Sequence, residues 1–258
     1  MKKLLMKSCL WIVCPALFLT SCRSGKSADG AGTVVVATTG WTAAYAEAAG
    51  AKEVVVLAPF EMEHPSEYEL RPGDIPEIMS AEIILYAGYE VMTEQLKRGL
   101  DIPEDKLLAV NTDYSYKSIE QSVMSIAERL GTEDVARENL LDIKHTFDEG
   151  RRVLREKNMA GKPVMAHRFQ SSIAKELGLI PLVLFGPSSP EAAEIAAASR
   201  EQVFMIIDNI HNPVGQPFRE IYPDKAYVQL LNFPGREGTK SLADVVRYNT
   251  LQVISAGE

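Results

Sequence analysis

Short runs of β-branched and other apolar residues alternate along most of this chain with stretches in which apolar residues recur at helical spacing. Runs of this length, bounded by Gly, Pro and polar residues, are typical of buried strands. We expect strands at residues 33–38, 53–57, 82–86, 107–110, 164–166, 182–185, 203–207 and 226–231. We expect helices at residues 41–49, 75–80 and 91–99, and a last helix that begins at about Ser241. Strands separated by helices predict βαβ units with mainly parallel sheets, and therefore an α/β fold.

The segment from Ser118 to Asn158 has a different character and divides this pattern into two halves. It contains no Pro and few Gly, and it carries dense charge with apolar residues at helical spacing. We expect a long helical connector that is broken near Gly131 and Thr132. The predicted architecture has an N-terminal α/β lobe (33–117), a helical connector (118–160) and a C-terminal α/β lobe (161–258). Such two-lobed proteins usually place their ligand in the cleft between the lobes.

The first 22 residues have the features of a bacterial lipoprotein signal. Three lysines precede an apolar run at residues 9–19, and Leu19-Thr20-Ser21-Cys22 forms a lipobox. The run is shorter than the about 20 apolar residues that a membrane-spanning helix needs. We expect a signal peptide (1–21), acylation of the Cys22 thiol and a flexible tether (22–32), so that lipid anchors the chain outside the cytoplasm, in the periplasm or at the cell surface. The alternative is an ordinary secretory signal that contains a cysteine by chance.

Charge and cysteine content narrow the classes of function. The formal net charge of the whole chain is −8. Loss of residues 1–21 removes three Lys and no acidic residue, so the mature chain has 24 basic and 35 acidic side chains and a net charge of −11. This balance is poor for binding nucleic acid or anionic lipid, and it suits either the attraction of cations or plain solubility. Cys9 and Cys14 leave with the signal peptide and Cys22 is consumed by lipid, so we expect no disulfide.

The sequence lacks the common signatures of enzymes. It contains no Gly-x-Ser-x-Gly, no phosphate-binding loop and no Gly-x-Gly-x-x-Gly, and the cysteine count leaves no usable thiol nucleophile. We therefore predict a binding protein rather than an enzyme.

Four stretches of the chain carry a resemblance to the substrate-binding lipoproteins of zinc and manganese ABC transporters, and this resemblance extends over essentially the whole mature chain. These stretches are residues 35–40, 67–75, 167–179 and 245–249. Residues 67–75 are similar to the family loop that begins Asp-Pro-His-Glu-Tyr-Glu, and residues 167–179 are similar to the histidine and amphipathic helix that open the second lobe. The resemblance implies two lobes joined by a rigid helix, a metal ion held between them, and delivery of that metal to an ABC permease.

Members of that family take metal ligands from four places, of which His167 matches the one that opens the second lobe. Because imidazole suits Zn²⁺ and carboxylates suit harder ions, His167 favours zinc over manganese as the metal. The alternative for His167 is a polar residue at a strand end. At the first-loop position stands Ser66, with His64 two residues earlier, a displacement of about 6–7 Å in extended chain. His64 serves as a ligand if the loop bends around Pro65, and otherwise it is an exposed loop histidine.

The other two family positions have also changed. Asn111-Thr112-Asp113 stands where a second histidine is expected, and Lys240 stands at the aspartate position. Asp113 offers an oxygen ligand or simply forms a turn. Asp208 and His211 are candidate replacements because ligands of α/β proteins gather at the carboxyl ends of strands, although a polar loop also explains them. The predicted metal ligands are His64, His167, Asp208 and His211. The side chains expected to line the cleft are Trp41, Ser66, Glu90, Asp113, Arg168 and Lys240.

These observations favour a solute-binding lipoprotein that captures a divalent transition metal, zinc before manganese, and passes it to a membrane permease. Because three family ligand positions have changed, the same fold with a metal chelate or an organic anion in its cleft is an alternative. Lys240 and Arg168 would then meet anionic groups. An adhesin-type surface lipoprotein is a further alternative, because the lipid anchor alone identifies no partner.

Overall fold

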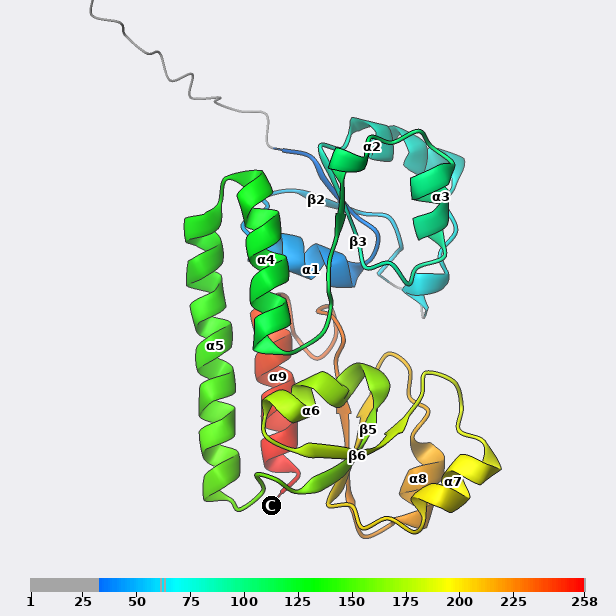
Figure 1. Ribbon diagram of the computed structural model, residues 1–258, viewed down its shortest axis with the longest axis vertical. Helices are drawn as coiled ribbons and strands as arrows, with labels where there is room; N and C mark the ends of the chain where they lie inside the picture. Colours follow the sequence, from blue (N-terminus) through cyan, green and yellow to red (C-terminus); the bar gives the residue numbers. More distant parts are fainter. Residues whose placement is uncertain (1–32, 61, 63, 258) are drawn as a thin grey trace, which may run out of the picture. The chain divides into compact units, whose positions relative to one another are not determined.

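The structure of this chain, a computed structural model, describes residues 33–60, 62 and 64–257 (Figure 1). The expected signal peptide, the tether and Cys22 lie outside these residues. In the described part of the chain, no helix is both long and apolar enough to cross a membrane. The described residues form two parallel sheets with surrounding helices, as the hydrophobic pattern predicts.

The first lobe is built on a four-stranded parallel sheet with the order β2-β1-β3-β4. Its strands are β1 (Val35–Ala37), β2 (Val54–Val56), β3 (Ile83–Tyr86) and β4 (Leu107–Ala109). Its helices are α1 (Gly40–Ala48), α2 (Ile75–Ser80) and α3 (Met92–Arg98), with short 3₁₀ turns η1 (Pro65–Glu67), η2 (Pro72–Asp74) and η3 (Glu104–Lys106). Val36 of β1 lies opposite Val55 and Ile84 in the neighbouring strands. Every residue of β1 is buried, as expected of a central parallel strand that is covered on both faces.

The second lobe repeats this arrangement with a parallel sheet in the order β6-β5-β7-β8. Its strands are β5 (Pro163–His167), β6 (Ile180–Phe185), β7 (Met205–Asn209) and β8 (Ala226–Leu230). Its helices are η4 (Arg168–Gln170), α6 (Ser171–Glu176), α7 (Ala192–Ala198), α8 (Gln216–Ile221) and α9 (Leu242–Ser255). In each sheet the strand order reverses beside the first strand, at β1 and β3 and at β5 and β7. Open α/β sheets bind ligands at the carboxyl ends of such strand pairs.

Two helices, α4 (Tyr116–Leu130) and α5 (Glu133–Glu156), run side by side, and α5 extends along one flank of both lobes (Figure 1). The predicted break in the connector is present, because Gly131 ends α4 in the left-handed conformation with a φ of 68°. Glycine adopts this conformation at the least cost. α5 buries Leu140, Ile143, Phe147 and Leu154, which are spaced as the helical pattern of the sequence predicts.

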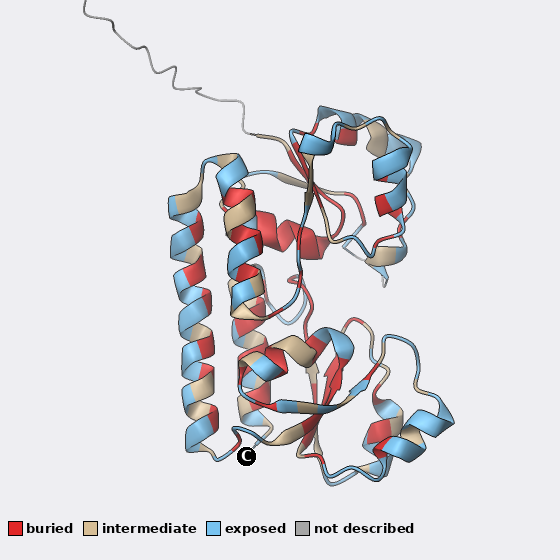
Figure 2. Ribbon diagram, in the orientation of Figure 1, coloured by how far each residue is buried: buried red, intermediate tan, exposed pale blue. Residues whose placement is uncertain are grey.

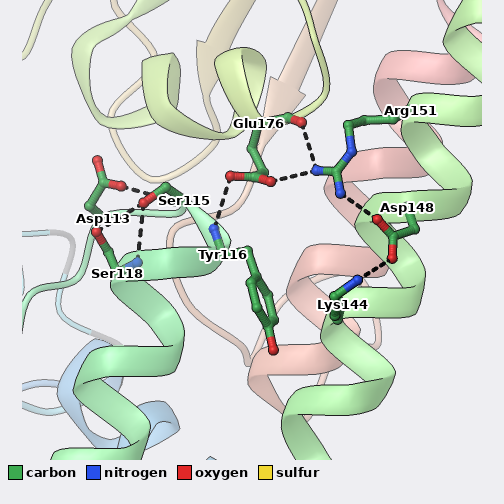
Figure 3. Close-up of polar contacts among 8 residues, drawn as sticks. All are labelled: Asp113, Ser115, Tyr116, Ser118, Lys144, Asp148, Arg151 and Glu176. Carbon is green, nitrogen blue, oxygen red and sulfur yellow. Dashed lines mark hydrogen bonds and ion pairs between the residues drawn. The ribbon is translucent and has the colours of Figure 1, made fainter.

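A polar network fixes this connector to the second lobe (Figure 3). Arg151 of α5 donates to the carboxylate of Glu176, at the end of α6, over 2.5 Å, and to its carbonyl oxygen over 3.1 Å. The Glu176 carboxylate also accepts from the backbone N–H of Tyr116, the first residue of α4, over 3.0 Å. Asp148 extends the network by pairing with both Arg151 and Lys144. Because Glu176 is bonded to both connector helices, α4, α5 and α6 are held as one unit.

One apolar core extends through both lobes. Figure 2 shows buried residues on α1, on the strands of both sheets and at intervals along α5. Its members include Val35 and Leu85 of the first sheet, Tyr45 of α1, Ile126 of α4, Phe147 of α5, Val164 and Ile207 of the second sheet, and Val246 of α9. The outer faces of the sheets have separate clusters, around Ile84 and Met92 in the first lobe and around Ile206 and Phe218 in the second. The lobes are therefore joined by packed side chains as well as by the chain, which fixes the strand ends on either side of the cleft.

Candidate functional site

A cavity of about 200 Å³ lies between the two lobes, beyond the carboxyl ends of their strands. The first lobe lines it with Thr39, Trp41, His64, Pro65, Ser66, Glu67 and Tyr89. The second lobe lines it with Phe169, Pro187, His211, Asn212, Asn232 and Phe233. The cavity is therefore lined by four side chains of the predicted site, Trp41, His64, Ser66 and His211. Two of them are imidazoles that come from opposite lobes.

The loop that carries His64 is held by backbone hydrogen bonds. η1 begins at Pro65, and the N–H of Glu67 donates to the carbonyl of His64 over 3.0 Å. The carbonyl of Ser66 accepts from the N–H of Val91 over 2.9 Å, which ties the loop to the turn after β3. A 3₁₀ turn rises only about 2 Å per residue, compared with about 3.3 Å in a strand. The bend around Pro65 therefore brings His64 and Ser66 to the same cavity despite their separation in sequence.

His211 follows β7 and is 7% exposed. Its backbone N–H donates to Asn209 Oδ1 over 2.9 Å, and its ring stacks on Phe233 with the centroids 3.9 Å apart. Its Nδ1 accepts from the N–H of Asn232 over 3.3 Å, whereas its Nε2 has no hydrogen-bond partner among residues 33–60, 62 and 64–257. Burial lowers the pKa of His211 to about 4, and the nearby Arg236 guanidinium acts in the same direction. At neutral pH this ring is therefore uncharged.

His167 ends β5 and is fully buried behind the wall of the cavity. Its Nδ1 accepts from the N–H of Phe169 over 3.2 Å, and its Nε2, like that of His211, finds no partner in the part of the chain that the structure describes. Gly186 covers this nitrogen so closely that a methyl group there would lie 2.4 Å from Nε2. Burial lowers the pKa of His167 below its ordinary value. The residue that best matches the family position is thus one layer behind the cavity.

Two predicted carboxylates are engaged within their own lobes. Asp208 is fully buried, and its oxygens accept from the N–H groups of Asn209 and Gly215, each over 2.8 Å, and from the Tyr227 hydroxyl over 2.5 Å. Glu90 is 3% exposed and accepts from Thr38 and Thr93 side chains and from the N–H groups of residues 87 and 88. Both carboxylates organise the backbone at the strand ends rather than lining the cavity.

A second cavity, of about 510 Å³, lies on the other side of an aromatic partition. Trp41, Tyr89 and Phe169 line both cavities, and the Trp41 ring lies 6.2 Å from each of the other two ring centroids. The predicted residues Asp113 and Arg168 line this second cavity, together with Asn111 and Thr112. Of the side chains that the structure describes, Lys240 lines neither cavity, and its backbone N–H donates to Asp244.

The described residues contain no group of three or more His, Cys, Asp or Glu side chains placed to hold a metal ion. His64 and His211 share a cavity, whereas His167 and Asp208 lie behind its wall. The predicted set of four ligands is therefore not assembled in this conformation, and its use as a metal site stays a prediction about the bound state.

The sequence analysis missed several residues of the cavity wall, of which Asn232 and Phe233 are the most informative. They follow the end of β8 after Leu231, at the same edge of the sheet as His167 at the end of β5. The rule that ligands gather at the carboxyl ends of parallel strands, applied also to the predicted strand at residues 226–231, would have identified both.

Comparisons with known proteins find the same fold but no relative in sequence. No protein-family model matches this chain, and no curated protein does. Among solved structures, the periplasmic metal-binding protein from Candidatus Liberibacter asiaticus is 14% identical, with a TM-score of 0.69 over 88% of this chain and 100% of that one. The solute-binding protein FpvC from Pseudomonas aeruginosa, in complex with Ni²⁺, is 17% identical, with a TM-score of 0.68 over 88% of this chain and 97% of that one. At such identities the likeness establishes a shared two-lobed fold.

Proposed function

We propose that this chain is an extracytoplasmic solute-binding protein that captures a divalent transition metal in the cleft between its lobes. The observation that carries the proposal is the cavity between the lobes, which the imidazole of His64 and the carboxylate of Glu67 line together from the first lobe. Imidazole and carboxylate are ordinary ligands of zinc and related ions. Zinc is the first expected cargo because imidazole suits Zn²⁺ and His64 lines this wall, and manganese is the second.

The structural neighbours support a transition metal as cargo. The protein from Liberibacter was solved bound to Mn and to Cd, and FpvC was solved in complex with Ni²⁺ and with Mn²⁺. With this cargo, the lipobox at Cys22 would anchor the chain to a membrane, and an ABC permease would receive the metal. A binding role without catalysis also agrees with the absence of enzyme signatures from the sequence.

A second form of cargo, a metal chelate or an organic anion, is favoured by a specific feature of the cavity. Its walls contain four aromatic rings, those of Trp41, Tyr89, Phe169 and Phe233, together with two side-chain amides. Aromatic and amide walls suit an organic molecule better than a bare ion.

Metal analysis of the purified chain without residues 1–22, combined with calorimetric titration of Zn²⁺ and Mn²⁺, tests the proposed function. We expect about one metal ion per chain. His64→Ala should weaken metal binding by about tenfold or more, because it removes an imidazole that reaches the cavity. The matched control is His145→Ala, on the exposed side of α5, which should bind as the unaltered protein does. If His64→Ala binds metal, free or chelated, with unchanged affinity, the metal does not sit in this cavity.

A further inference from the structure

The protonation state of His211 follows from its neighbour. A neutral imidazole carries one proton, and a ring nitrogen that accepts a hydrogen bond does not hold it. Nδ1 of His211 accepts from the N–H of Asn232, so the proton is on Nε2. His211 lines the cavity, 93% of the residue is buried, and within the described ranges its buried Nε2 has no partner. His211 thus presents an unused N–H donor at the cavity.

The geometry around Asn232 keeps this arrangement in place. Its carbonyl accepts from the Tyr114 hydroxyl over 2.6 Å, and its side-chain oxygen accepts from Gln170 Nε2 over 2.6 Å. The backbone N–H of Asn232 is therefore fixed in direction. Rotation of the His211 ring by half a turn would place a carbon against that N–H and leave a buried donor unpaired, at a cost of about 1–3 kcal/mol.

This arrangement is the reverse of the one that metal ligation needs. A histidine that binds a metal offers a lone pair and almost always donates its other ring N–H to a carboxylate or carbonyl. His211 instead accepts at that other nitrogen, and so does His167, whose Nδ1 accepts from the N–H of Phe169. Both histidines of the second lobe are therefore held as donors at Nε2.

The side chain of Asn232, which also lines the cavity, has the same polarity as His211. The side-chain oxygen of Asn232 is taken by Gln170, which leaves its NH₂ group as the donor of this cavity-lining side chain. The Arg236 guanidinium lies near His211, where its Nη1 donates to the carbonyl of Ile210 over 3.2 Å. A wall of N–H donors next to a cation matches an anionic oxygen and repels a bare dication.

We propose that the second lobe binds a carboxylate of an organic chelator, with His211 Nε2–H as the donor, and that the metal enters the cleft already complexed. This rests on the proposed function and deepens it, because it assigns the carboxylate oxygens to the second lobe and the metal to His64 in the first. The cavity of about 200 Å³ has room for more than an ion, since one water molecule occupies about 30 Å³ in the liquid. The aromatic partition supplies a wall for the carbon skeleton of the chelator.

Nuclear magnetic resonance of the metal-free chain with ¹⁵N-labelled histidine tests the premise directly. With four histidines in the chain, each ring can be assigned by substitution. We expect His211 to show a protonated Nε2 and an unprotonated Nδ1. The opposite tautomer would overturn the proposal, whatever the chain binds.

Titration with three probes tests the ligand class: Zn²⁺ alone, citrate alone, and Zn²⁺ with citrate. We expect the complex to bind at least about tenfold more tightly than either component, with the Nε2 proton of His211 retained. His211→Gln keeps an N–H donor at about the place of Nε2 and should stay within about threefold of the unaltered protein. His211→Ala removes the donor and should lose about tenfold or more. His145→Gln, on the exposed face of α5, is the control for the substitution itself.

The outcomes separate the inference from the function on which it rests. Zn²⁺ alone could bind tightly, with loss of the Nε2 proton and with the same loss of affinity in His211→Gln and His211→Ala. This result would refute the chelate and leave metal capture intact. Binding of citrate alone as tightly as the complex would refute a role for the metal. Failure of all three probes to bind would count against both proposals.

Discussion

Glu90 and Asp208 hold corresponding places in the two lobes. Each is a buried carboxylate at the carboxyl end of a central strand pair, and each accepts hydrogen bonds from two backbone N–H groups and at least one hydroxyl. Ligands of α/β proteins often receive such donors. Here the internal carboxylates of Glu90 and Asp208 accept from these donors, and the cavity is lined by side chains of the loops instead.

This assignment predicts that Glu90→Gln destabilises the protein. The amide NH₂ would face N–H donors at Ala87 and Gly88, so at least one buried donor would lose its acceptor. We expect the free energy of unfolding to fall by about 2–4 kcal/mol, measured by urea denaturation. Glu94→Gln, on the exposed face of α3, is the matched control and should change it by less than about 0.5 kcal/mol. Equal effects of the two substitutions would contradict a structural role for the Glu90 hydrogen bonds.

The candidate site shows what sequence reasoning captures at the scale of the residue. It named Trp41, His64, Ser66 and His211, which line one cavity. Trp41 and His211 came from their places after predicted strands, whereas His64 and Ser66 came from the resemblance of their loop to a family motif. It did not show that Gly186 would cover His167. This contact depends on how the ends of the neighbouring strands β5 and β6 pack against each other, which the sequence pattern does not specify. The hydrogen bond from the Asn232 N–H to His211 Nδ1, which determines the tautomer of the ring, cannot be predicted from sequence either. Such a bond depends on atomic positions to within fractions of an ångström.

At the scale of the element, hydrophobic periodicity predicted every strand and the break at Gly131. The strands were recognisable because buried parallel strands are continuous apolar runs. The short helices α7 and α8 were not predicted. α7 is rich in alanine and exposes most of its surface, so it has little apolar periodicity. α8 has only six residues, too few to display a helical repeat.

Gly150 in the middle of α5 provides a test of how the connector packs. A glycine inside a helix costs about 1 kcal/mol relative to alanine, so substitution should stabilise an isolated helix. In the folded chain, however, a Cβ at this position would lie 2.6 Å from Thr250 Cγ2 of α9 and 2.8 Å from Leu177 Cδ2. We therefore expect Gly150→Ala to lower the free energy of unfolding by about 1–3 kcal/mol.

Glu138→Ala, on the exposed face of the same helix, controls for helix propensity and should change the stability by no more than about 0.5 kcal/mol. A Gly150→Ala variant that is more stable than the unaltered protein would show that α5 and α9 are further apart than the structure places them.

At the scale of the whole molecule, sequence analysis divided the chain into two lobes, and the structure adds that they share a core. The apolar face of each element is visible in its sequence, but the element that covers it is not. α9 illustrates this, because it follows the second sheet in sequence and its residues contribute to a core that also contains Val35 and Leu85 of the first sheet. The described residues accordingly belong to one compact unit.

The shared core predicts that the two lobes unfold together. Hydrogen exchange at increasing urea concentration should give the same limiting free energy of opening for amides of β1 and β7, because neither sheet keeps its covering without the other. Far-ultraviolet circular dichroism should show a single transition at the corresponding concentration. An opening that exposes one sheet at a clearly lower free energy, while the other stays protected, would contradict this interpretation.

Trp41 gives the cleft an optical property of its own. Trp11 lies in the expected signal peptide, so the mature chain would retain Trp41 as its sole tryptophan. Its indole lies against Tyr89, Tyr114 and Phe169 and borders both cavities. The intrinsic fluorescence of the mature protein would therefore come from one fluorophore in the wall of both cavities. If the chain has the proposed function, loading and release of a metal would change this emission without any attached label.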